Sequence, residues 1–140
     1  LDDLTSIAIE ELEHFKLVLK LLKKRGILFG QAVSSPWLSG IMKTVRKGRD
    51  EQVIDHLLCA AMIEGRSCEK FQILSEALVS VDAPLAEFYA SLVESEGNHY
   101  AAYLLMAKQV DESETNRRLD FYLDLDAELV QKPNDLHILH

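Results

Sequence analysis

The chain has 140 residues, a length that fits one domain able to bury ~70% of the surface of its unfolded state. Hydrophobic residues make up 48% of it and charged residues 27%, as in an ordinary globular protein. The formal net charge of −8 argues against nucleic-acid binding through overall charge, although an acidic surface can still carry a local basic patch. No apolar run approaches the roughly 20 residues of a membrane span and no signal peptide is recognisable, so we expect a cytoplasmic protein.

Five helices and no strands are predicted, because apolar residues recur every three or four positions between breaks at glycine and proline. The helices are expected at about residues 3–25, 36–45, 50–79, 83–110 and 113–132. Ser35 and Asp82 are suitable N-caps, and each has a proline shortly after it. Residues 134–140 show no clear period.

The two cysteines, Cys59 and Cys68, both fall in the long helix predicted at 50–79. They are nine positions apart, or ~13 Å of helical rise, which is too far for a disulfide between them. We therefore expect two reduced thiols, as in a reducing compartment.

Three of the predicted helices carry an apolar stripe that is interrupted near its middle by ionisable side chains. The interruptions are Glu11 and His14 in the first helix, Glu64 in the third, and Glu96 and His99 in the fourth. A buried ionised glutamate costs several kcal/mol unless it is paired or binds a cation. Because ionisable residues interrupt the apolar stripe on three helices, we infer that the three helices share one cation site.

Each Glu-x-x-His pair projects a carboxylate and an imidazole from adjacent turns of one helix face. Two such pairs with further glutamates are the ligand pattern of ferritin-like di-iron and di-manganese bundles. We therefore expect an all-α, ferritin-like four-helix bundle with additional helices and a two-metal centre. Oxygen and nitrogen ligands of this mixture favour iron or manganese over zinc.

Alternatives remain open on the residues alone. A single Glu-x-x-His is usually a solvated surface pair, and a purely structural bundle could pair its polar core residues with one another. Two irons could serve hydroxylation by dioxygen or iron oxidation and storage. Side chains near the pattern that we do not expect to bind metal are Glu10, Glu13, Glu94, His56, Cys68 and Tyr103.

Three segments carry a resemblance to a known family. They are Glu-Glu-Leu-Glu-His-Phe at 10–15, Ile-Glu-Gly-Arg-Ser-Cys-Glu at 63–69 and Glu-Gly-Asn-His-Tyr at 96–100, and the closing stretch from 126 through Pro133 agrees with them. The chain resembles the ferritin-like tRNA hydroxylases that act on 2-methylthio-N6-isopentenyladenosine, and the second segment is the most specific.

The resemblance implies that the five interrupting residues are ligands of two irons. It implies oxygen-dependent hydroxylation of the isopentenyl group on a modified adenosine next to the tRNA anticodon. Dioxygen would be the co-substrate, and an external donor would supply electrons.

The family plan includes one more glutamate on a preceding helix, whereas this chain begins in what corresponds to the second helix. We therefore expect residues 1–140 to be a single ferritin-like domain that is truncated at its N-terminus. Asp124, Asp126 and Glu128 of the last helix are conceivable replacements for the missing ligand, but we expect that helix to be structural.

Two groups of basic residues could form a surface for the anticodon loop. The candidates for tRNA contact are Lys24, Arg25, Lys43, Arg46, Lys47 and Arg49. The alternative is that these charges complement helix dipoles or are simply solvated. Trp37, beside them, is expected to anchor the short helix rather than to stack on a base.

The rival function is a ferritin- or rubrerythrin-like protein for iron oxidation, storage or electron transfer. The absence of a Cys-x-x-Cys pair in the sequence counts against the rubrerythrin type.

Overall fold

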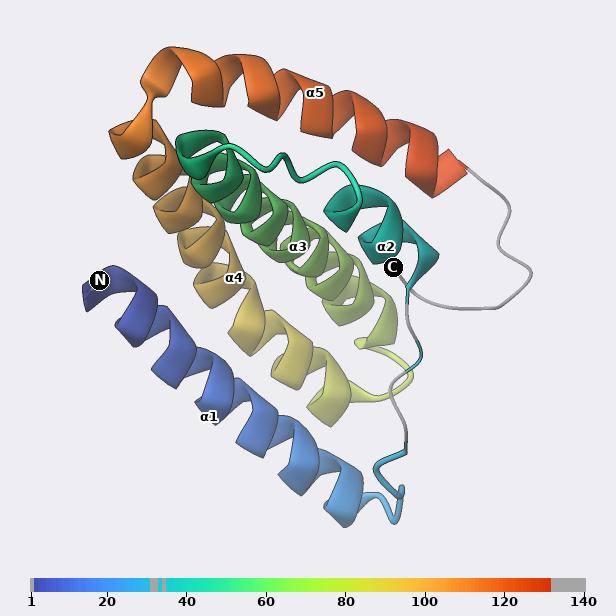
Figure 1. Cartoon of the computed structure of the whole chain (residues 1–140). Helices are drawn as coiled ribbons and strands as arrows, with labels where there is room; N and C mark the ends of the chain where they lie inside the picture. Colours follow the sequence, from blue (N-terminus) through green and yellow to red (C-terminus); the bar gives the residue numbers. More distant parts are fainter. Residues whose placement is uncertain (1, 31–32, 34, 132–140) are drawn as a thin grey trace. The chain divides into compact units, whose positions relative to one another are not determined.

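The computed structural model describes residues 2–30, 33 and 35–131. Within these ranges it contains no strand and five helices, which are α1 (Asp2–Lys24), α2 (Pro36–Met42), α3 (Arg49–Leu78), α4 (Ala83–Val110) and α5 (Glu112–Gln131) (Figure 1). The all-α prediction is confirmed, and the largest boundary difference is at α2, which ends three residues earlier than expected. Pro133 and residues 134–140 lie outside the described residues. None of the helices in the described ranges is long and apolar enough to cross a membrane.

The chain divides into two compact units, Leu1–Val33 and Ser34–His140, and each is described by itself. In the first unit α1 ends at Lys24, and two residues later Gly26 has a φ of 66°, a left-handed conformation that glycine adopts without strain. The Ile27 N–H donates to the Leu22 carbonyl at 3.0 Å, closing the helix with the long bond of a Schellman motif. Phe29 then meets Phe15 edge-on, with ring centroids 5.8 Å apart, so the segment after Gly26 turns back along α1.

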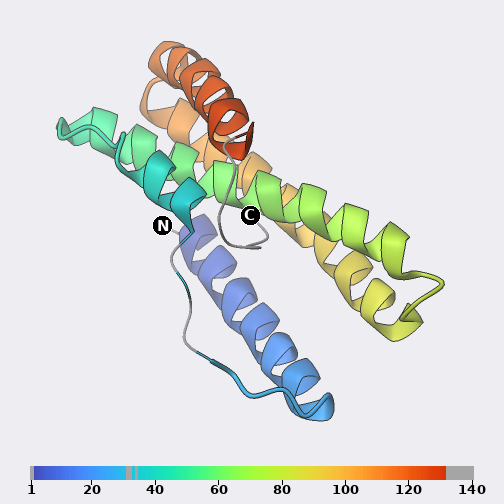
Figure 2. The ribbon, with the colours of Figure 1, turned by 90° about the vertical axis from the view of Figure 1, so that its right-hand side faces the viewer.

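The second unit is built around an antiparallel pair formed by α3 and α4, which a short turn joins (Figure 1). Helices α2 and α5 pack against each other and against α3 (Figure 2). Both expected N-caps are confirmed: Ser35 Oγ accepts from the Leu38 N–H at 3.4 Å, and Asp82 Oδ1 accepts from the Leu85 N–H at 3.1 Å.

The core of this unit lies where α2, α3, α4 and α5 meet. Its buried members are Trp37, Ile41, Ile54, Leu58, Cys59, Met62, Ala107 and Tyr122. The Trp37 indole N–H donates to Asp126 Oδ1 at 2.8 Å, which joins α2 to α5. Trp37 therefore anchors the short helix, as predicted. Asp126 holds α5 to α2 through this hydrogen bond, which agrees with the expectation that the last helix is structural.

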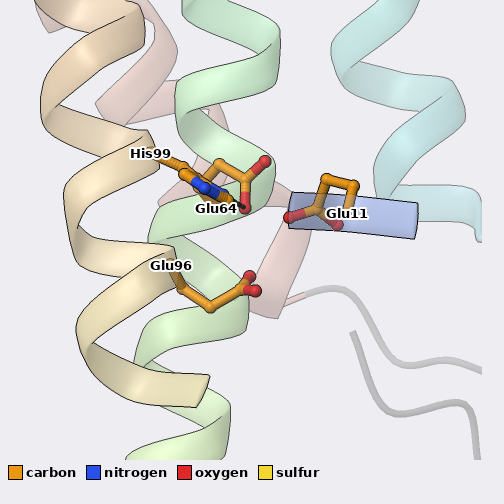
Figure 3. A group of neighbouring side chains, drawn as sticks. All are labelled: Glu11, Glu64, Glu96 and His99. Atoms are coloured by element: carbon orange, nitrogen blue, oxygen red, sulfur yellow. Dashed lines mark ion pairs between the residues drawn. The ribbon is translucent and has the colours of Figure 1, made fainter. Parts of the chain in front are cut away.

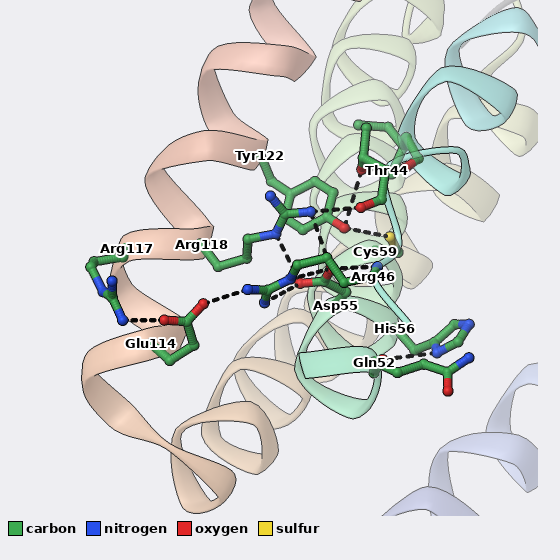
Figure 4. A network of polar contacts seen from close by, with 11 residues as sticks. Thr44, Arg46, Gln52, Asp55, His56, Cys59, Glu114, Arg117, Arg118 and Tyr122 are labelled. Atoms are coloured by element: carbon green, nitrogen blue, oxygen red, sulfur yellow. Dashed lines mark hydrogen bonds and ion pairs between the residues drawn. The ribbon is translucent and has the colours of Figure 1, made fainter. Parts of the chain in front are cut away.

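A buried carboxylate, Asp55 of α3, connects three parts of this unit (Figure 4). It accepts from the Arg46 backbone N–H at 3.0 Å, from Arg46 Nε at 2.9 Å and from Arg46 Nη2 at 2.8 Å. Arg118 of α5 adds bonds from Nε at 2.9 Å and from Nη2 at 3.1 Å. The α2–α3 connection and α5 are thus both held to α3.

The electrostatics of Asp55 follow from this arrangement. Burial alone would raise the pKa of its carboxyl, but the hydrogen bonds from Arg46 and Arg118 outweigh burial and hold the pKa below its usual range. Arg46 is fully committed here, because its remaining nitrogen, Nη1, donates to Glu114 at 2.6 Å. The sequence placed Arg46 in a basic surface for tRNA, whereas the structure directs its guanidinium to two carboxylates.

The substitution Asp55→Ala should lower the free energy of unfolding by about 3–5 kcal/mol, because it leaves two partly buried arginines without their shared carboxylate. Chemical denaturation at neutral pH measures this change. Asp120→Ala, which removes an exposed carboxylate from α5, is the control and should stay within about 0.5 kcal/mol of the parent. Equal effects of the two substitutions would contradict the assignment.

Acid should reveal the same interaction. The folded pKa of Asp55 lies below the unfolded value of about 3.9. The stabilisation is therefore complete above that pH and is lost as the pH falls through the folded pKa. Denaturation at a series of acidic pH values should show a smaller loss of stability in Asp55→Ala than in the parent.

Candidate metal centre

Glu64 of α3 and Glu96 and His99 of α4 converge between the two antiparallel helices (Figure 3). One possible ligand atom from each lies within 4.8 Å of the others, and His99 Nδ1 is 4.0 Å from Glu64 Oε2. All three residues are buried, with exposed fractions of 8% for Glu64, 5% for Glu96 and 2% for His99. The structure thus brings together three of the five residues that interrupt the predicted apolar stripes.

The donor set fits a divalent cation. Two carboxylates in a buried position repel each other and are poorly solvated, so the cluster favours either proton uptake or a bound cation. Oxygen and nitrogen ligands lie about 2.0–2.6 Å from the divalent ions that proteins bind, so ligand atoms on opposite sides of one ion are about 4–5 Å apart. The observed spacing is of that size, and the mixture of carboxylate and imidazole suits iron or manganese.

A glycine follows each of the two clustered glutamates and allows the helices to approach closely. A Cβ atom at Gly65 would lie 3.3 Å from the Tyr100 ring, and one at Gly97 would lie 3.8 Å from Cys68 Sγ. The repeated Glu-Gly dipeptide at 64–65 and 96–97 is a signal visible in the sequence that no prediction used. Gly65 marks a close approach of α3 to the Tyr100 ring, whereas a Cβ atom at Gly97 would make an ordinary van der Waals contact.

The cysteines behave as predicted, because both are free thiols. The Cys68 S–H donates to the Val93 carbonyl oxygen at 3.5 Å and so lines the helix interface beside Gly97. Cys59 is buried and donates to Tyr122 Oη at 3.5 Å, and burial raises the pKa of its thiol.

The other Glu-x-x-His pair lies in the first unit, on α1. Glu11 Oε1 and His14 Nδ1 are 3.4 Å apart, so the two side chains share one face of the helix, as their spacing predicts. The adjacent Glu13 is exposed and pairs instead with Lys16 at 2.7 Å, in agreement with its expected solvated role.

Two further residues that were expected not to bind metal are exposed in the second unit. His56 Nδ1 lies 2.9 Å from the Gln52 carbonyl oxygen of its own helix (Figure 4), and Glu94 is exposed on α4.

The basic residues proposed for tRNA contact separate into different environments. In the second unit Lys43, Lys47 and Arg49 are exposed, whereas Arg46 is held by Asp55 and Glu114. Lys24 and Arg25 are exposed at the end of α1, in the first unit.

Comparison with known proteins gives consistent matches. The family model described as tRNA-(MS[2]IO[6]A)-hydroxylase (MiaE) matches residues 1–140. A Salmonella typhimurium protein named tRNA 2-(methylsulfanyl)-N(6)-isopentenyladenosine(37) hydroxylase is 34% identical over 134 residues, which cover 96% of this chain and 48% of that protein. A Pseudomonas putida protein of the same name is 35% identical over 132 residues, covering 94% of this chain and 63% of that protein. The chain therefore spans about half the length of the first relative and less than two thirds of the second.

A solved structure is also similar. It is Protein 43 with aldehyde deformylating oxygenase activity from Synechococcus, with 30% sequence identity and a TM-score of 0.89, covering 96% of this chain and 67% of that one. This likeness confirms the ferritin-like fold class that the sequence predicts.

Fe(II) added without oxygen should raise the Tm of the full chain, because an ion that binds only the folded state stabilises it, by about 2.7 kcal/mol at a hundredfold excess over Kd. Glu96→Gln should remove most of that increase, since a neutral amide replaces a buried carboxylate. Glu94→Gln, an exposed change two positions away, should leave the increase intact. Calorimetric scans with and without Fe(II) measure both, and a full increase in Glu96→Gln would contradict metal binding at this cluster.

Proposed function

The chain belongs to the tRNA-(MS[2]IO[6]A)-hydroxylase (MiaE) family, and we propose that it carries out oxygen-dependent hydroxylation of the isopentenyl group on a modified adenosine next to the tRNA anticodon, using two irons. The observation that carries this proposal is the buried cluster of Glu64, Glu96 and His99 between α3 and α4. Dioxygen can be activated for hydroxylation at a metal centre, and a buried cluster of two carboxylates and an imidazole can provide ligands for one. We place the reaction in the cytoplasm, where its tRNA substrate would be met.

We propose that Glu11 and His14 supply further iron ligands. The support is that their spacing repeats that of Glu96 and His99, and that the two side chains stand together on one face of α1. The ferritin-like ligand pattern has two such pairs, each on its own helix.

Bound iron would supply the reducing power that activates dioxygen for insertion of one oxygen atom into a C–H bond. The overall balance converts a C–H bond, dioxygen, two electrons and two protons into a C–OH group and water, so an external electron donor is required. The residues of the chain keep this chemistry away from bulk water, because Glu64, Glu96 and His99 are all buried. The carboxylates of Glu64 and Glu96 would offset the positive charge of bound iron.

Iron storage or electron transfer of the ferritin or rubrerythrin type is less well supported. The two curated relatives are named as hydroxylases, and the similar solved structure has a named oxygenase activity. These names favour oxygen insertion over storage.

For tRNA, we propose that Lys43, Lys47 and Arg49 contact phosphates, together with Lys24 and Arg25 of the first unit. All five side chains are positively charged and exposed, so a polyanion can reach them. Arg46 is left out of this proposal because its guanidinium is bound to Asp55 and Glu114.

Hydroxylation should be detectable directly. The iron-loaded chain, a chemical reductant, ¹⁸O₂ and tRNA bearing the methylthio-isopentenyl adenosine should yield a hydroxylated nucleoside with one ¹⁸O atom, measured by mass spectrometry after digestion. Glu11→Gln should lower the rate by about 100-fold, since even groups that only support metal ligands typically cost 10–100-fold when they are replaced. Glu13→Gln is the matched control on the same turn and should keep the parental rate. An iron-loaded parent that produces no labelled nucleoside would refute the proposal.

The exposed basic residues can be tested separately. Lys47→Glu should weaken tRNA binding and reduce the slope of log affinity against log salt by about one, because one phosphate contact is lost. Lys108→Glu, the same charge reversal in the last turn of α4, should leave both quantities unchanged. Titrations at several salt concentrations measure both variants, and identical slopes would exclude Lys47 from the interface.

A further inference from the structure

A pocket of about 160 Å³ lies beside the contact between α2 and α3, wholly within the second unit. Its polar lining comes from Ser35, Arg66, Ser67 and Lys70, and Trp37 forms part of its apolar wall. Most of the lining is apolar, from Trp37, Leu38 and Ile63, and the two cationic side chains and two hydroxyls supply the polar part that can receive a small anion. Its volume is below the roughly 300 Å³ at which pockets for small molecules usually begin, so a single group fits it better than a whole cofactor does.

The two cations differ in how their charge is compensated. Arg66 Nη1 donates to Glu69 at 3.0 Å, its Nε lies 3.4 Å from Asp126, and its guanidinium stands 6.0 Å from the centre of the Trp37 ring. Lys70, one turn further along α3, makes no hydrogen bond or ion pair with any residue among those that the structure describes. The ammonium of Lys70 is therefore a positive charge in the pocket that forms no ion pair with a described carboxylate.

The surroundings make that charge unusual. Burial lowers the pKa of Lys70, the positive charge of Arg66 lowers it further, and only Glu96 acts in the opposite direction. A half-buried ammonium next to a second cation is costly unless an anion joins them. Lys70 is six positions, or ~9 Å of helical rise, beyond Glu64 on α3.

We propose that this pocket binds a phosphate of the tRNA substrate, with Lys70 as its principal contact. The inference rests on the proposed function, because it identifies the anion from the substrate of the neighbouring centre. Lysine binds phosphate as a compact point charge, and the hydroxyls of Ser35 and Ser67 can donate to phosphate oxygens. A phosphate held beside the cluster would fix the strand while the target base leaves its stack.

Lys70→Gln in the full, iron-loaded chain tests the assignment. Affinity for an anticodon stem-loop, measured by fluorescence anisotropy, should fall roughly tenfold, as expected for one lost charged hydrogen bond. The salt slope should fall by about one. In turnover assays KM for tRNA should rise while kcat is kept, and Lys70→Arg should restore binding.

Two controls show whether a loss of tRNA affinity is specific to Lys70. Lys108→Gln removes one positive charge elsewhere on the same unit and should leave affinity and slope unchanged. The Tm and iron content of Lys70→Gln should stay close to those of the parent, because Lys70 makes no hydrogen bond or ion pair with a described residue. Parental affinity and slope in Lys70→Gln would overturn the inference.

Inorganic phosphate distinguishes the sources of the anion. If millimolar phosphate raises the Tm of the parent but not of Lys70→Gln, while both bind the stem-loop equally, the pocket is a site for free phosphate and the assignment to tRNA is wrong. Failure of the proposed function looks different, since the iron-loaded parent would then form no hydroxylated nucleoside. An active parent with unchanged tRNA binding in Lys70→Gln rejects this inference alone.

Discussion

The second unit depends on the ion pairs of Asp55. A fully buried carboxylate is destabilising unless its charge is compensated, and here two arginines from distant parts of the sequence compensate it. Arg118 also donates to the Thr44 carbonyl at 2.7 Å and stacks over the ring of Phe121, 4.1 Å from its centroid. One end of α5 is thereby fixed on α3, and the Trp37–Asp126 hydrogen bond holds the helix to α2 further along. With two fixed points, α5 cannot slide along α3 without breaking a buried polar contact.

The same helix, α3, carries Glu64 on the side that meets α4. Close packing beside it is seen at Gly65, where an added Cβ atom would lie 3.3 Å from the Tyr100 ring. Helix α3 is therefore constrained by ion pairs toward α5 and by close packing toward α4. Such support from both sides would hold the carboxylates of a preorganised metal centre in place. Two buried carboxylates and an imidazole on facing helix surfaces are costly for folding unless they are paired or bind a cation, so a cluster of this kind points to function.

Much of this arrangement was accessible from the sequence. Helices and their caps are local, so Ser35 and Asp82 could be assigned from neighbouring residues alone. The clustered residues Glu64, Glu96 and His99 could be found because they break an apolar period that is itself visible. The partners of Asp55 could not be found from the sequence, because Arg118 is 63 positions away and nothing in the local pattern distinguishes it from a surface arginine.

Arg46 shows the related limit of charge patterns. Counting basic residues between α2 and α3 cannot tell which are already bound to carboxylates, and Arg46 is bound to two. A chain with a net charge of −8 can still bind a polyanion through cations whose charge is not already compensated within the fold. That description applies to Lys70 and not to Arg46. The proposed tRNA contacts are therefore chosen by charge compensation rather than by the number of basic residues, and Lys70 of the pocket beside α2 and α3 takes the place of Arg46 among them.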